Sequence, residues 1–197
     1  MKKVLILAVV AMMTTMGTKA QTGYEDTKHE VAVSYGWLSN SQWVNVLEEM
    51  VSIMVGSTCE NEKFFGPLSA EYFYHANKWL GVGGMFTLSN SKQDVYLDKK
   101  KDGTVSHTYY TLMPAVKFDW LRKKSFGMYS KLAVGATLRT ESINCDDPSA
   151  RDSESKVHVN WQASLLGIEA GSPKVRGFLE FGFGEQGVAL FGLRYKF

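Results

Sequence analysis

Two groups of serine and histidine residues have the atoms needed for nucleophilic catalysis, in which histidine removes the proton of a serine hydroxyl. They are Ser106 with His107, and Ser153 and Ser155 with His158. Adjacent residues of a β-strand point to opposite faces, so Ser106 and His107 cannot meet if their segment is a strand. We interpret both groups as parts of serine-rich loops. The sequence therefore predicts no catalytic residues and no enzyme.

The other histidines and the two cysteines do not indicate a metal or a cofactor. His29 and His75 have no third partner at ligand spacing, and two cysteines cannot form a cysteine-only zinc site. Cys59 and Cys145 fall in two of the long connections discussed below. In an oxidising compartment they could form a disulfide, and two free thiols are the alternative.

The composition is that of a folded, nearly neutral protein. The chain has 197 residues, of which 45% are hydrophobic and 21% charged, and this excludes a disordered chain. Its 22 basic and 20 acidic residues are too evenly balanced to indicate a nucleic-acid partner. Residues 1–20 combine two lysines, an uncharged run from Val4 to Met13 and the small residues of Thr18-Lys19-Ala20, which is typical of a cleaved secretory signal peptide.

After residue 20 the sequence alternates between apolar and polar residues in eight segments, the pattern of strands with one apolar face. In 29–39, for example, Val31, Val33 and Trp37 share one face, with Glu30 on the other. The phase slips near Leu165, where we expect a bulge. The remaining segments are 68–76, 80–89, 109–120, 131–139, 157–171, 175–183 and 189–197, and Pro114 within them predicts a second local bulge, because proline removes a ladder donor.

The connections between these segments alternate in length. Long connections follow the first, third and fifth segments, whereas the joins at 77–78, 121–125 and 172–174 are short. This alternation predicts an all-β, eight-stranded antiparallel up-and-down barrel with long loops at one end. Within the first long connection, 41–55 has apolar residues at helical spacing, which predicts a short amphipathic helix.

Charged residues on the polar faces distinguish a membrane barrel from a soluble one. A soluble barrel carries its charges outside and lines its interior with apolar side chains. Here the apolar faces carry no charge, so we expect a transmembrane barrel with its charges in the lumen, where they form ion pairs and plug it. The expected luminal charge network has five acids and five bases: Glu30, Glu71, Asp119, Glu169, Glu180, Lys117, Lys131, Arg139, Arg194 and Lys196.

Aromatic residues are sorted to the ends of the predicted strands, as in the two interfacial girdles of membrane barrels. Those near the long loops are Trp37, Tyr110 and Trp161, and those near the tight turns are Trp79, Trp120, Phe126 and Phe197.

The chain ends in Gly192-Leu193-Arg194-Tyr195-Lys196-Phe197, which resembles the C-terminal signal that the barrel-assembly machinery recognises in outer-membrane proteins. Gly192, Tyr195 and Phe197 match that signal, whereas Leu190 stands where a polar residue is usual. Together with Gly167-Ile168-Glu169 and the segment 182–187, this region resembles the small outer-membrane β-barrel domains of Gram-negative bacteria, akin to OmpA- and OmpX-type barrels.

The resemblance implies a fold and a location but no single activity. It implies an outer-membrane barrel at 29–197, and with the signal peptide predicted at 1–20 this leaves a short periplasmic segment at 21–28. Expected partners are outer-membrane lipid, lipopolysaccharide and the barrel-assembly machinery, and we expect a monomer. The predicted role is structural, or surface contact through the external loops. A narrow porin-like channel and, less favoured, a lipid A-modifying enzyme are the alternatives.

Overall fold

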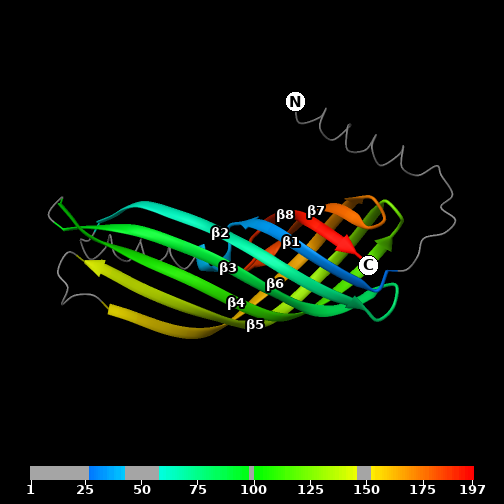
Figure 1. Ribbon diagram of the computed structural model, residues 1–197, viewed down its shortest axis with the longest axis horizontal. Coiled ribbons are helices and arrows are strands. Elements are labelled where there is room, and N and C mark those ends of the chain that lie inside the picture. Colours follow the sequence, from blue (N-terminus) through cyan, green and yellow to red (C-terminus); the bar gives the residue numbers. More distant parts are fainter. Residues whose placement is uncertain (1–26, 43–57, 98–99, 146–151) are drawn as a thin grey trace, which may run out of the picture.

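Eight strands form a closed antiparallel barrel in the computed structural model, which describes residues 27–42, 58–97, 100–145 and 152–197 (Figure 1). Each strand pairs with the next, and the last strand closes onto the first. The predicted up-and-down barrel is therefore confirmed. The strands are β1 (His29–Trp37), β2 (Thr58–His75), β3 (Leu80–Leu97), β4 (Lys100–Arg122), β5 (Phe126–Cys145), β6 (Asp152–Gly171), β7 (Val175–Gly184) and β8 (Ala189–Lys196).

The alternation in the sequence becomes an alternation between the outer wall and the lumen. Along β7, buried and exposed residues alternate at every position. Val33, Leu179 and Leu193 are more than half exposed on the outer wall, whereas the charged side chains of Lys131 and Arg194 are buried inside. A barrel with an apolar exterior and ionised groups inside has the arrangement of membrane-spanning barrels. In the part of the chain that the structure describes, no helix is long and apolar enough to cross a bilayer.

The strand register confirms one predicted bulge and corrects the other. The pairing of β6 with β7 shifts between Ser164 and Leu166, as the phase slip predicted. At Pro114 the expected bulge is wrong, because β4 keeps an unbroken register with β3, where Gly84 pairs with Pro114. With β5, the register is the same at Leu112 and at Ala115, on either side of the proline. The ladder thus accommodates a residue without an N–H donor and does not change its phase.

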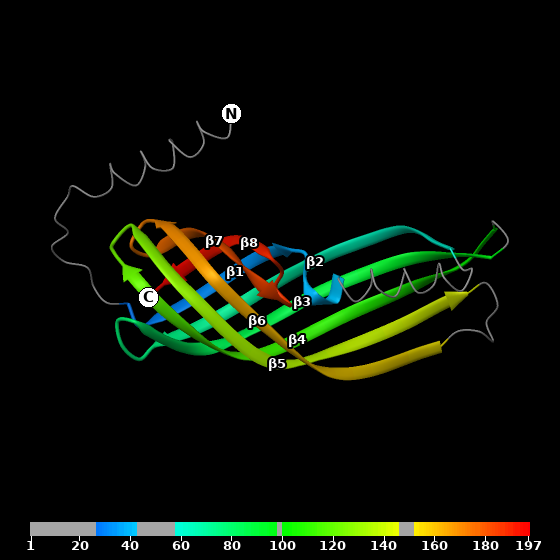
Figure 2. The same ribbon diagram turned by 180° about the vertical axis from the view of Figure 1, so that it is seen from behind.

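The strands fall into two length classes. Those from β2 to β6 have 18 to 23 residues, whereas β1, β7 and β8 have 8 to 10. The long strands continue through most of the segments that we expected to be loops, 90–106 and 141–156. Figures 1 and 2 show this part of the sheet extending well past the ends of β7 and β8, at the end opposite the tight turns. We call this extension the projecting wall.

The predicted helix of the first long connection is described only at its start. Asn40, Ser41 and Gln42 are helical, and Ser39 and Gln42 cap this turn reciprocally, with backbone N to side-chain oxygen distances of 2.9 and 3.3 Å. The rest of the predicted helix lies outside the described residues. So do the predicted signal peptide and most of the segment 21–28, which stay predictions.

Candidate functional site

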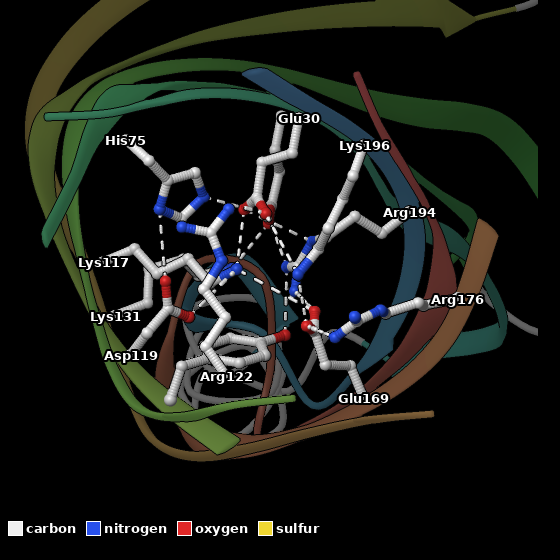
Figure 3. A network of polar contacts seen from close by, with 12 residues as sticks. Glu30, His75, Lys117, Asp119, Arg122, Lys131, Glu169, Arg176, Arg194 and Lys196 are labelled. Carbon is white, nitrogen blue, oxygen red and sulfur yellow. Dashed lines mark hydrogen bonds and ion pairs between the residues drawn. The ribbon is translucent and has the colours of Figure 1, made fainter. Parts of the chain in front are cut away.

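The lumen between the tight turns and the middle of the barrel holds a network of buried charged side chains, drawn in Figure 3. Lys117 on β4 reaches Glu30 on β1, with 2.7 Å between Nζ and Oε1. Lys131 on β5 lies between Glu71 on β2 and Glu180 on β7, at 2.5 and 2.8 Å. These contacts join strands that are not neighbours in the sheet, so the side chains cross the lumen.

Glu169 on β6 is the centre of a second group, in which one carboxylate accepts hydrogen bonds from three cations. Arg176 on β7 donates to its Oε1 and Arg194 on β8 donates to its Oε2, both at 2.6 Å. Lys196 on β8 also donates to Oε1. Hydrogen bonds from charged donors are stronger than neutral ones and satisfy the carboxylate in the absence of bulk water.

His75 and Tyr129 connect these groups. Both ring nitrogens of His75 face a carboxylate, at 3.1 Å from Glu30 and 3.2 Å from Asp119. The Tyr129 hydroxyl donates to Glu180 at 2.6 Å and accepts from Arg194 at 3.0 Å. Its ring also lies 4.6 Å from the Arg194 guanidinium carbon, within the range of a cation–π contact.

The structure brings most members of the expected luminal network together. Arg139 lies apart, half-buried and nearer the projecting wall, where it contacts Glu141 at 3.5 Å and His107 at 3.2 Å. The sequence predicts pairs between Glu30, Glu71 or Asp119 and Lys117, Lys131 or Arg139. Lys117 pairs with Glu30 and Lys131 with Glu71, whereas the described contacts of Arg139 include none of these three acids. The members that gather are Glu30, Glu71, Lys117, Asp119, Lys131, Glu169, Glu180, Arg194 and Lys196.

Two charged residues of the lumen were missed by the sequence analysis. Arg176 is fully buried and shares the inward face of β7 with Glu180, four residues away, so the alternation of that strand could have identified it. Besides Glu169, its guanidinium donates to the carbonyls of Lys123 and Lys124, at 2.6 and 3.0 Å. Glu185 follows the last residue of β7, where no alternation indicates a direction.

Glu185 is buried in the connection between β7 and β8, at the end of the barrel opposite the tight turns. Its carboxylate is buried and accepts hydrogen bonds from the backbone N–H of Ser41 at 3.2 Å, the Ser41 hydroxyl at 2.6 Å and the Asn160 amide at 2.9 Å. Thr111 adds a longer contact at 3.5 Å. Burial raises the pKa of the Glu185 carboxyl, and the hydrogen bonds from Ser41 and Asn160 oppose that shift. The short β7–β8 turn and the start of the first long connection are thereby joined at one carboxylate.

The serine and histidine groups take part in local polar contacts. Asn90 donates to Ser106 at 3.5 Å, and His107 lies 3.4 Å from Glu141. Ser155 shares a hydrogen bond with Thr140 at 3.4 Å, and His158 is exposed. The side chain of Ser153 is not among those described. Over the described ranges, no group of three His, Cys, Asp or Glu side chains is placed to hold a metal ion.

The backbone register bears on the predicted disulfide. Cys59 pairs with Val95, Val95 with Gly103, and Gly103 with Cys145, so the cysteines share one row of the sheet with two strands between them. Three strand spacings amount to about 14 Å. A disulfide needs Cα atoms within about 7 Å, so the register opposes a bridge within one chain. The disulfide stays a prediction, and two free thiols fit the register better.

The residues that match the assembly signal also have places in the fold. Gly192 lies opposite Phe178, and a Cβ atom added at Gly192 would come within 2.7 Å of the Phe178 ring. Tyr195 and Phe197 point outward, with their rings stacked at 5.7 Å. At the same end, Trp79 stacks on Phe118 at 6.4 Å. The aromatic residues expected in girdles are exposed or half-buried on the outer wall.

Comparison with known proteins gives a match of fold only. No family model matches the chain, and no curated protein matches it. Among solved structures, it is similar to Ail, the attachment invasion locus protein of Yersinia pestis, with 12% identity and a TM-score of 0.50. A structure of Ail in complex with the heparin analogue sucrose octasulfate matches with 13% identity and the same TM-score. Each match covers 88% of this chain and 100% of Ail. The chain thus has the eight-stranded barrel fold of small outer-membrane barrels such as Ail.

Proposed function

We propose that this protein resides in the bacterial outer membrane and contacts other surfaces through its projecting wall. The barrel is the anchor, with its tight turns toward the periplasm and the projecting wall outside the cell. In this orientation the β7–β8 connection that carries Glu185 faces the exterior.

The outer wall supports the anchoring role. The short strands β1, β7 and β8, with 8 to 10 residues, have about the length of a transmembrane β-strand. Apart from His29 at the start of β1, their outward side chains are aliphatic or aromatic, and Trp37 and Phe197 lie at opposite ends of this band. Burying such a band in lipid is favourable, whereas leaving it in water promotes aggregation.

The observation that carries the contact role is an apolar patch beside an unpaired strand edge. The pairing of β6 with β7 stops at Gln162, so within the described ranges the stretch of β6 from Asp152 to Asn160 has no partner strand on that side. Val157 and Val159 lie there, four and two residues beyond Trp161, and are 71% and 78% exposed. Unpaired edges and exposed apolar patches are features of protein interaction sites. The name of Ail refers to attachment, which supports choosing attachment as the assay.

The proposal is tested in an adherence assay, in which a Gram-negative strain that expresses this protein is incubated with cultured epithelial cells. We expect more adherent bacteria with the chain than without it, and a lower number with the double variant V157T/V159T. V31T/V33T is the matched control, because it makes the same change on β1, in the lipid-facing band. Equal adherence with and without the chain would refute the contact role.

We also propose that the luminal charge network closes the barrel to ions. Eight strands enclose a lumen just wide enough for side chains, and here charged side chains cross it from β4 to β1 and from β5 to β2. The expected result in planar bilayers is no steady conductance for the purified protein. A large and steady conductance would favour the alternative of a porin-like channel.

A further inference from the structure

The end of the barrel that carries the tight turns is basic. Lys28, Lys78, Lys123 and Lys174 are exposed there, and Arg122 and Lys124 are half-buried. The described residues of this end, 27–28 and the turns 76–79, 121–125 and 172–174, include no aspartate or glutamate. Glu25 and Asp26, which precede Lys28 in the sequence, lie outside the described residues.

The positive charge at this end of the barrel does not reflect a positive net charge of the whole protein. Without residues 1–20, which contain three of the 22 basic residues, the chain has 19 basic and 20 acidic residues. The members of the luminal charge network that gather inside the barrel, all except Arg139, are buried and paired with one another, and they do not contribute to this surface. A nearly neutral chain therefore presents a separate basic face at one end of its barrel.

The turns hold their lysines close to the apolar band. Hydrogen bonds close all three turns, from Asn77 N to Leu80 O at 3.4 Å, from Lys123 N to Phe126 O at 2.9 Å and from Ser172 N to Val175 O at 2.8 Å. Figure 1 shows these turns together at one end of the barrel, near the C-terminus. Trp79 and Trp120 are exposed beside them, and such rings prefer the membrane interface. In the proposed membrane location these lysines would therefore lie at the depth of lipid headgroups.

We propose that this basic face binds the phosphate groups of anionic phospholipids, of the phosphatidylglycerol class, in the leaflet next to the tight turns. The inference rests on the proposed membrane location. Lysine near an anionic membrane surface is attracted to it over roughly one Debye length, about 8 Å at physiological salt. Turns this short cannot extend their charges far into the aqueous space. Lipid phosphate is therefore the anion closest to these lysines, and anionic polymers farther out in the periplasm lie beyond the short turns.

The test uses the mature chain with Trp79 as its only tryptophan, the others replaced by phenylalanine. The protein is reconstituted in phosphatidylcholine bilayers that contain a fixed fraction of brominated phosphatidylglycerol or of brominated phosphatidylcholine, since bromine quenches a nearby tryptophan. We expect stronger quenching of Trp79 by brominated phosphatidylglycerol, and a loss of this preference at high salt. K123Q/K174Q should reduce the relative affinity by about fivefold for each charge removed.

The matched control is K92Q/K156Q, which removes two exposed lysines of the projecting wall and should leave the preference unchanged. Equal quenching by the two lipids in the unsubstituted protein would overturn the inference, as would an equal loss in both double variants. Heat-modifiable migration on gels monitors folding in the same samples. A protein that fails to fold in either bilayer would contradict the membrane location itself, whereas a folded protein without lipid preference would contradict only the basic face as a lipid site.

Discussion

Lys117 and Glu30 face each other across the lumen, 2.7 Å apart, although β4 and β1 are separated in the barrel by two other strands. Both side chains are buried, and Lys117 also lies 3.6 Å from Asp119. A buried charge without its partner is costly, because its lost hydration is not replaced. The pair therefore links opposite walls of the barrel as well as balancing charge.

Removing one partner of this pair should destabilise the barrel strongly. K117M keeps much of the side-chain volume but leaves Glu30 and Asp119 without their nearest lysine, and we expect the free energy of unfolding to fall by about 3 to 5 kcal/mol. Urea titration of the protein refolded in detergent micelles, followed by tryptophan fluorescence, measures this change.

The double variant E30Q/K117M removes both charges and should lose less stability than K117M alone. K92M is the surface control, since Lys92 is exposed, and its effect should remain within about 0.5 kcal/mol. Equal losses in K117M and K92M would show that the ion pair contributes nothing measurable.

Glu185 should make stability depend on pH. Burial raises the pKa of its carboxyl above the ordinary value of 4.5. At pH values above this raised pKa the carboxylate is buried in its ionised form, which lowers the free energy of unfolding. As the pH falls from the raised pKa toward 4.5, the folded state takes up a proton and this cost is relieved.

The variant E185Q removes the cost at all pH values. A glutamine can accept from the Ser41 N–H and the Asn160 amide with its oxygen, and donate to the Ser41 hydroxyl with its nitrogen. E185Q should therefore be more stable than the unsubstituted protein at neutral pH, with the difference shrinking as the pH falls toward 4.5. Paired urea titrations across this range measure it. A difference that grows as the pH falls would have the wrong sign.

The glycine of the C-terminal motif should matter to the folded barrel itself. A methyl group added in G192A would meet the backbone oxygen of Val33 first and the Phe178 ring at 2.7 Å, and we expect a loss of about 1 to 3 kcal/mol from overpacking. Refolding of the purified chain in detergent, without any assembly machinery, measures this effect. If G192A refolds with unchanged stability but fails to assemble in cells, Gly192 acts only in recognition.

The two cysteines should react as free thiols. Mass spectrometry of a digest alkylated without reductant should give separate labelled peptides for Cys59 and Cys145, because the sheet register places them about 14 Å apart. A Cys59–Cys145 bridged peptide would require a local rearrangement of the projecting wall.

The sequence predicts which side chains face the lumen wherever one face of a strand is apolar. Alternation around Val31, Leu112 or Leu193 identifies the outer wall, and the same pattern places Glu71 and Lys131 inside, where the structure has them. A single-residue slip would move every side chain of a strand to the other face, so this pattern fixes orientation strongly.

Beyond the apolar band, the alternation that fixes the orientation of a strand is lost. Segments such as 90–97 and 100–106 carry polar residues on both faces, so the pattern that identifies a strand is lost although the backbone ladder continues. Glu185 was missed for a related reason, since it lies in a turn and its environment is set by Ser41 and Asn160, distant in sequence. The bulge expected at Pro114 did not occur because the register was already fixed on both sides of it.

The seam where β8 meets β1 has an electrostatic consequence for assembly. β8 brings Arg194 and Lys196 to the lumen, and Glu30 on β1 lies within 3.7 Å of both. Until β8 pairs with β1, Arg194 and Lys196 lack one of their counter-ions. A β8–β1 pairing shifted along the strands would move these cations away from Glu30. Closure of the seam therefore adds Glu30 as a further counter-ion to cations that already contact Glu169, and this electrostatic gain favours the native alignment of β8 and β1 over displaced ones.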